Sequence, residues 1–190
     1  MVSSVELPVK PVSQRAQHDR YDAVTIAFHW VTAALVLFLF ASAMLWTYGP
    51  RDLRSLESLH VSFGIALAAV LVGRLVWRLA AGRRLAHPGG VVVTWASRVV
   101  HWALYALLAI QVGLGFGLKW FEGQALNFFG LWSLPSPFAA NRALGHQLEE
   151  LHNLTAWTLA YLVGAHAIAA LVHRYVFKDG VLRRMLPIAG

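Results

Sequence analysis

Four stretches of this chain are apolar for long enough to cross a lipid bilayer as helices. They cover about residues 23–47, 58–79, 99–118 and 151–177, and their only charged residues are Arg74, Arg78 and Arg174, each near the end of its stretch. A helix needs about 20 apolar residues to cross a bilayer. Because the bilayer core offers no water to open backbone groups, such segments must be helical. The sequence therefore predicts an all-α, integral membrane four-helix bundle.

Composition supports this class and narrows the chemistry. Hydrophobic residues make up 58% of the chain and charged residues 13%, against about 25% charged in a typical soluble domain. Cysteine is absent, which excludes disulfides, thiolate zinc sites, iron–sulfur clusters and covalently attached c-type haem. Any metal ion must therefore be held mainly by histidine.

The basic residues indicate orientation rather than nucleic-acid binding. Cytoplasmic flanks of membrane helices are enriched in Lys and Arg, and most of the basic residues precede the first span, join the second to the third or follow the fourth: Lys10, Arg15, Arg20, Arg78, Arg83, Arg84, Arg98, Arg174, Lys178, Arg183 and Arg184. The other two connections hold only Arg51, Arg54, Lys119 and Arg142. This pattern explains the net charge of +7, so no nucleic-acid partner is expected. Both termini are predicted to be cytoplasmic, with the lipid bilayer as the main partner.

Two regions are expected. Residues 1–22 are polar and lack the short apolar core and small-residue cleavage site of a secretory signal, so they are predicted to be a flexible tail. Residues 23–187 form the transmembrane domain. Its longest outer connection, 119–150, is rich in aromatic residues and is expected to fold over the outer face of the bundle.

Four histidines are predicted to lie at two depths in the membrane. His152 and His166 are fourteen residues apart, which on a helix brings them to within roughly 40° of one face and about 21 Å apart along the axis. His60 lies near the outer start of the second span, level with His152. His29 lies near the inner start of the first span, level with His166. Polar side chains at membrane depth are expensive and are usually functional.

Paired histidines on facing helices suit a b-type haem, which binds without covalent attachment. Zinc or copper without a macrocycle needs three or four protein ligands at one level, and this pattern supplies two. The ordinary alternative for one such histidine is a hydrogen bond between helices. Four histidines in two depth-matched pairs favour ligation, so the sequence predicts two non-covalent, bis-histidine haems held by His29, His60, His152 and His166.

Arg74 follows His60 by fourteen residues, so it returns to the same helix face one level further in. A buried arginine needs an anionic partner, and the propionates of the inner haem are the predicted one. The alternative is a side chain that reaches the cytoplasmic interface. Roles for His101, His146 and His173 remain open; a haem, a quinone, a helix interface and lipid headgroups are all compatible with their positions.

The strings around these residues resemble the bacterial cytochrome b561 family. They are IAFHW at His29, LHVSFGI at His60, VGRLVWRL at Arg74 and GAHAIAALVHRYVFKDGVLRRMLP from Gly164. The resemblance extends over about residues 20–187 and is greatest to small four-helix, di-haem members of the superoxide oxidase type. In those members one haem is held by histidines of helices two and four and the other by histidines of helices one and four. Here these correspond to His60 with His152, and to His29 with His166.

The resemblance implies an oxidoreductase of the bacterial inner membrane that takes electrons from superoxide and passes them to ubiquinone. Outer Lys119, Arg142, Arg51 or Arg54 would attract the superoxide anion, although Glu122, Glu149 and Glu150 oppose that field. The alternative is an electron-transfer b subunit that serves a partner dehydrogenase or a periplasmic cytochrome. A structural or transport protein without haem is a third possibility.

Overall fold

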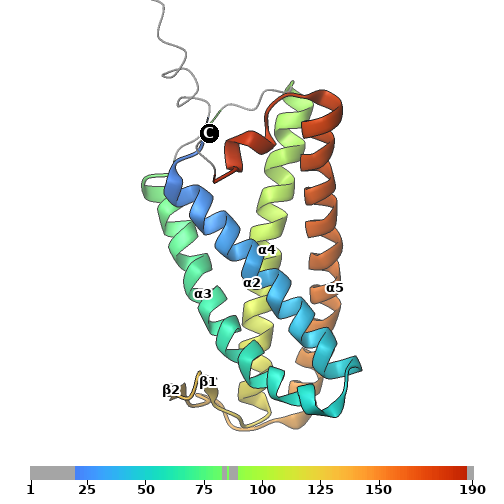
Figure 1. The fold of residues 1–190 in the computed structure, drawn as a ribbon. Helices are drawn as coiled ribbons and strands as arrows, with labels where there is room; N and C mark the ends of the chain where they lie inside the picture. The colour runs from blue at the N-terminus through green and yellow to red at the C-terminus, as the bar shows by residue number, and fades with distance from the viewer. Residues whose placement is uncertain (1–19, 83–84, 86–89, 188–190) are drawn as a thin grey trace, which may run out of the picture.

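The computed structural model describes residues 20–82, 85 and 90–187. Its elements in chain order are α2 (Ala23–Tyr48), η1 (Arg51–Ser55), α3 (Leu56–Ala80), α4 (Val91–Phe121), β1 (Leu126–Phe128), β2 (Trp132–Leu134), α5 (Arg142–Val172), η2 (His173–Phe177) and η3 (Leu182–Met185). Within these described residues, four helices are long and apolar enough to cross a membrane, which confirms the predicted all-α membrane bundle (Figure 1). Most of the predicted tail, together with His18, His87, Arg83 and Arg84, lies outside the described residues.

The third and fourth helices begin earlier than predicted. α4 starts at Val91 and α5 at Arg142, whereas apolarity alone put these starts near 99 and 151. At α5 the reason is a capping side chain: Asn141 accepts a hydrogen bond from the Leu144 N–H at 3.1 Å, which satisfies one of the open amides of the first turn. Hydropathy detects only the part of a helix inside the membrane. His146, expected in the outer connection, consequently lies in α5, and His101, expected at the start of the third helix, lies well inside α4.

The bundle consists of two antiparallel helix pairs. α2 packs closely against α3 and α4 against α5, and the main contact between the pairs is that of α3 with α4. The start of α2 and the segment η3 lie at the same end of the bundle, the upper end in Figure 1. There the Trp30 indole N–H donates to the Met185 carbonyl at 2.7 Å. This end is the one predicted to be cytoplasmic.

A layer of leucines closes the middle of the bundle. Leu39, Leu67, Leu108 and Leu159, one from each helix, form a buried cluster. Leu67 lies seven residues from both His60 and Arg74, and Leu159 lies seven residues from both His152 and His166. Seven residues are close to two helical turns, so these leucines stand on the histidine-bearing faces, midway between the two levels. Many of the other large apolar side chains are exposed, as expected for helices that face lipid.

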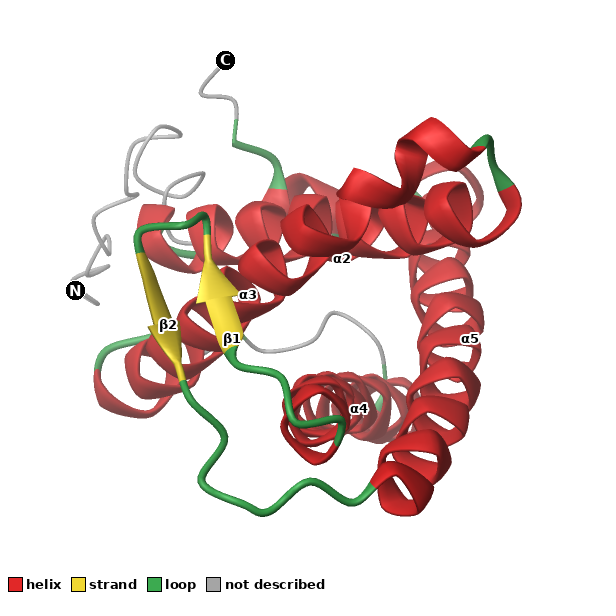
Figure 2. Cartoon of the chain, turned by 90° about the horizontal axis from the view of Figure 1, so that it is seen from below, coloured by secondary structure: helices red, strands yellow, loops and turns green. Residues whose placement is uncertain are grey.

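The outer connection forms a short hairpin beside α3. β1 pairs antiparallel with β2, with Phe128 opposite Trp132, and the hairpin lies beside the lower end of α3 (Figures 1 and 2). Ser62 of α3 holds it: the hydroxyl donates to the Asn127 carbonyl at 3.2 Å and accepts from the Phe129 N–H at 3.0 Å. The connection itself is shorter than predicted, because residues 119–121 belong to α4 and residues 142–150 to α5.

Leu67→Ala should destabilise the bundle more than Val72→Ala on the same helix. The Leu67 side chain is 3% exposed and that of Val72 is 63% exposed. Since lipid is as apolar as leucine, the cost comes mainly from the cavity, and we expect a loss of about 1–3 kcal/mol. Thermal unfolding of the detergent-solubilised protein measures it. Equal losses in the two variants would contradict a packed central layer.

Candidate functional site

The structure brings His60 of α3 and His152 of α5 together at the outer level. Their ring centroids are 6.3 Å apart and the ring planes are inclined at 72°. The Trp46 indole of α2 lies edge-on to the His60 ring at 4.8 Å. Two imidazoles from different helix pairs therefore face each other in the outer half of the bundle.

The His60 imidazole is oriented by the backbone of α2. Its Nδ1 lies 3.0 Å from the Leu39 carbonyl oxygen and 3.2 Å from the Ser42 hydroxyl. An Nδ1–H that donates to the carbonyl leaves the lone pair on Nε2. Histidines that bind metals are usually held in this way, with the distal N–H on a carbonyl or carboxylate.

The His152 imidazole is held by α4. One nitrogen, Nε2, lies 3.1 Å from the Gln111 amide nitrogen, and the Thr155 hydroxyl donates to the Gln111 amide oxygen. The other nitrogen, Nδ1, is buried with no hydrogen-bond partner among the described residues. Gly115 makes room for the ring, because a Cβ there would lie 3.1 Å from His152 Cε1. A buried nitrogen without a partner costs about 1–3 kcal/mol. A metal bond at Nδ1 would remove that cost with the Gln111 amide flipped, because its oxygen then accepts from Nε2–H and the lone pair is left on Nδ1.

The structure also brings His29 of α2 and His166 of α5 together, at the inner level. Their ring centroids are 6.4 Å apart with planes inclined at 67°. Arg74 of α3 reaches this pair, with its Nη2 atom 3.3 Å from His29 Nδ1. The three residues that the sequence assigned to the inner level are thus neighbours, although they come from three helices.

His101 of α4 is a third histidine at the inner level. Its ring centroid is 5.4 Å from that of His166, and its Nδ1 lies 2.6 Å from the Ser97 carbonyl oxygen. The His101 ring is about one ångström closer to His166 than His29 is. His101 is thus a direct neighbour of His166.

Both pairs fit a haem iron between the two rings. A metal–imidazole bond is about 2 Å and the ring centroid lies about 1 Å beyond the bonded nitrogen, so an iron sets the centroids roughly 6 Å apart. The distances of 6.3 and 6.4 Å match this, whereas the 5.4 Å between His101 and His166 is short for it. No group of three or more His, Asp or Glu that could hold a metal ion occurs in the described part of the chain. A macrocycle that supplies four ligands needs only two more from the protein.

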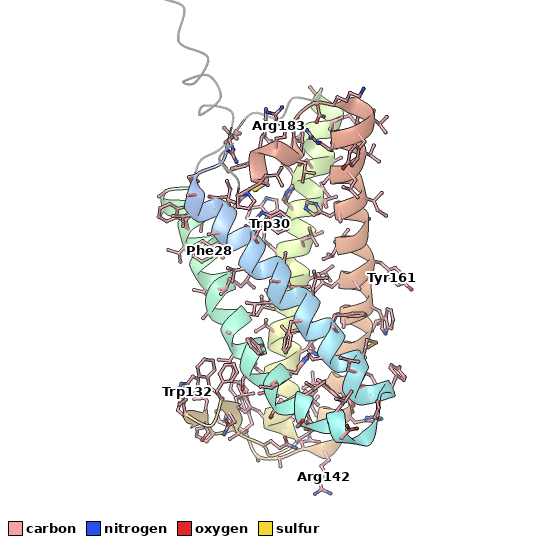
Figure 3. The ribbon with its side chains drawn as sticks, in the orientation of Figure 1. Phe28, Trp30, Trp132, Arg142, Tyr161 and Arg183 are labelled. Atoms are coloured by element: carbon pink, nitrogen blue, oxygen red, sulfur yellow. The ribbon has the colours of Figure 1, made fainter. Side chains whose placement is uncertain are left out.

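The outer charges are less available than the sequence suggested. The Lys119 ammonium lies 2.6 Å from a Glu57 carboxylate oxygen and 3.5 Å from one of Glu122, so its charge is largely compensated. His146 lies beside Glu149 and Glu150. Arg142, by contrast, begins α5 with an exposed side chain that points away from the bundle (Figure 3).

His173 lies at the inner end of α5, where α-helix gives way to the wider turn η2. Its Nδ1 is 2.5 Å from an Asp179 carboxylate oxygen. The backbone then reverses through Lys178, whose φ of 54° is left-handed. His173 thus belongs to the turn that ends the bundle and not to either histidine pair.

Sequence reasoning missed Gln111 and underrated Gly115. Gln111 is the one amide in the apolar stretch 99–118, and a polar side chain at that depth is a signal of function. Gly115 lies in this stretch with Gly113 and Gly117, and small residues in a membrane helix usually indicate close helix packing. In the structure Gly117 does pack against Leu148, Gly115 faces His152, and nothing lies within 4 Å of a Cβ at Gly113.

Comparisons with known proteins find similar sequences over most of the chain. A family model for prokaryotic cytochrome b561 matches residues 20–187. A probable superoxide oxidase CybB of Yersinia pestis is 31% identical over 176 residues, which cover 90% of this chain and 97% of the relative. Cytochrome b561 homolog 2 of Escherichia coli is 32% identical, over 88% of this chain and 92% of the relative. Cytochrome b561 homolog 1 of the same organism is 28% identical, over 89% of this chain and 98% of the relative.

Gly115→Ala should weaken the outer site, and Gly113→Ala should not. The added methyl at Gly115 forces the His152 ring to move by a few tenths of an ångström, whereas the methyl at Gly113 meets nothing within 4 Å. The reduced-minus-oxidised absorbance of haem per protein, measured after purification, reports the difference. Equal haem content in both variants would contradict the assignment of Gly115 to this site.

Proposed function

Since the chain belongs to the prokaryotic cytochrome b561 family, whose members transfer electrons in membranes, we propose that it holds two b-type haems and is a superoxide:ubiquinone oxidoreductase. The observation that carries the proposal is the presence of two histidine pairs with matching centroid distances of 6.3 and 6.4 Å at two depths. Superoxide as donor is supported by the name of one relative, a probable superoxide oxidase.

The proposed ligands are His60 with His152 for the outer haem and His29 with His166 for the inner one. Haem, when bound, supplies one-electron transfer, and two histidine ligands leave its iron no open position for dioxygen. The chain's own part is to hold each imidazole. His60 is tied to the Leu39 carbonyl and His152 to Gln111, which keeps both rings fixed while the charge between them changes.

The net reaction balances with two donors for each acceptor. Two superoxide anions each lose one electron and become dioxygen, and one ubiquinone gains two electrons and two protons and becomes ubiquinol. The four apolar helices place the chain in a membrane, where ubiquinone dissolves. We propose the bacterial inner membrane as that membrane, and the flanking charges favour cytoplasmic termini.

Capture of the anion is assigned to Arg142 rather than to Lys119. Two carboxylates neutralise the field of the Lys119 ammonium. The Arg142 side chain is exposed at the outer end (Figure 3), where a cation raises the local concentration of an anionic substrate. The nearby Glu149 and Glu150 lower this effect, so the contribution of one charge is modest.

His60→Ala should remove the outer haem and keep the inner one, and His29→Ala should do the reverse. His60→Ala leaves His152 without its partner ring at the outer level. His29→Ala leaves His166 with His101 at the inner level, and their centroid distance of 5.4 Å is short for an iron between the rings, so neither variant keeps a pair spaced for bis-histidine binding. His146→Ala, an exposed histidine of the same bundle, is the matched control. Haem-to-protein ratio and redox titration distinguish the three proteins. If His152→Ala left both haems at full occupancy, the pairing would be wrong.

Purified protein should consume superoxide in a manner that depends on added soluble quinone, and Arg142→Glu should slow this. We expect the second-order rate constant to fall about two- to fivefold at low ionic strength, because the field at the entry side is reversed locally, and the difference to vanish at high salt. Rapid mixing measures it. Arg174→Glu, exposed at the opposite end of the bundle, should leave the rate unchanged.

One outcome of that assay separates the two functions. A protein with both haems but no quinone-dependent superoxide consumption would contradict the assignment of superoxide as the electron donor. It would favour an electron-transfer subunit that receives electrons from a partner protein.

A further inference from the structure

Two arginines of α3 share one tyrosine of α4 at the inner end of the bundle. The guanidinium carbon of Arg74 lies 5.2 Å from the centroid of the Tyr105 ring, and that of Arg78 lies 5.7 Å from the same centroid. The two arginines are four residues apart, one helical turn along the same face. A ring within about 6 Å of a cation attracts it, so Tyr105 draws both guanidinium groups toward α4.

In the described part of the chain these two cations have no carboxylate partner. Among the described residues neither Arg74 nor Arg78 makes an ion pair. Asp22 and Asp179 are the described carboxylates of this end, and both are engaged. Asp22 accepts hydrogen bonds from Thr25 and Trp77, and a carboxylate oxygen of Asp179 is hydrogen-bonded to His173 Nδ1. Two guanidinium groups beside one ring repel each other. A ligand with two anionic oxygen groups would relieve that repulsion.

The contact of Arg74 with His29 ties this arginine pair to the inner histidines. Arg74 is a donor only, so its bond to His29 Nδ1 at 3.3 Å needs the Nδ1 lone pair and leaves the ring proton on Nε2. An imidazole that binds iron through Nε2 carries its proton on Nδ1 instead. Arg74 then loses its acceptor and needs another within reach.

We propose that Arg78 and Tyr105, together with Arg74, form a clamp for both propionate groups of the inner haem. This rests on the proposed function, which places a haem between His29 and His166. A b-type haem carries two propionates on one edge, and two arginines one turn apart offer one guanidinium to each. Tyr105 is a positioning residue: its ring holds the second guanidinium against α4 and away from the membrane interface.

The competing occupant is a lipid phosphate. Arg78 is exposed near the end of α3, where a long cationic side chain can reach the headgroups. Its position over the Tyr105 ring favours the bundle side, since the ring belongs to the neighbouring helix. Both occupants are anionic oxygen groups, so the experiment must tell them apart.

The test is Arg78→Gln, with the midpoint potentials of both haems measured by redox titration in the full-length protein. Removing a cation beside a haem disfavours the electron-rich reduced form. The potential of the inner haem should fall by up to about 59 mV, which is a tenfold change in the reduced-to-oxidised ratio, and that of the outer haem should stay constant. Arg98→Gln is the matched control, because Arg98 is an exposed arginine over another ring, that of Trp95, at 5.5 Å.

Tyr105 supplies the second variant. Tyr105→Leu should lower the inner potential in the same direction, and Tyr105→Phe, which keeps the aromatic face, should restore it. Equal shifts in Arg78→Gln and Arg98→Gln, or no shift in either, would overturn the clamp. So would an Arg78→Gln shift that appears in vesicles with phosphatidylglycerol and not in vesicles of phosphatidylcholine alone, because that dependence identifies a lipid phosphate.

Failure of the clamp and failure of the proposed function give different results. Wild-type protein with two haems and an unshifted Arg78→Gln variant rejects the clamp alone. Wild-type protein that lacks the inner haem rejects the clamp and the di-haem proposal together.

Discussion

The arrangement depends on the repeat along α5. His152, Leu159 and His166 are spaced seven residues apart, so one face of one helix presents an imidazole, an apolar side chain and a second imidazole at successive depths. Two other helices bring histidines to this face. α3 brings His60 to the outer imidazole and α2 brings His29 to the inner one. The two sites therefore share a helix but not a second ligand.

This geometry also explains why the bundle is built from two close pairs rather than four equivalent helices. The histidine pairs run between α5 and the α2–α3 pair, across the line where helix packing is weakest. The family's haem cofactors, placed there, would supply contacts that the side chains do not make between the pairs. Small residues take part in this design: Gly115 lets the His152 ring approach α4.

The sequence predicted what depends on hydropathy and helical period. These rules placed four membrane helices, both histidine pairs and the neighbourhood of Arg74 and His29. They failed where a side chain outside the membrane determines the start of a helix. Asn141, for example, caps α5, which begins at Arg142 rather than near the predicted 151. They also failed where partners come from distant segments. The neutralisation of Lys119 by Glu57 joins residues 62 apart in sequence, and the support of His152 by Gln111 joins residues 41 apart; no local pattern contains either contact.

The leucine layer has a consequence for energy conversion. Leu39, Leu67, Leu108 and Leu159 offer a proton no group on which to move, whereas an electron can tunnel past apolar side chains. In the proposed reaction, an electron that enters at the outer haem and leaves from the inner one therefore carries negative charge across the middle of the membrane without a compensating proton. Each electron that moves inward past this apolar layer makes the cytoplasmic side more negative. The transfer works against an interior-negative membrane voltage, at about 2.3 kcal/mol for each charge and 100 mV.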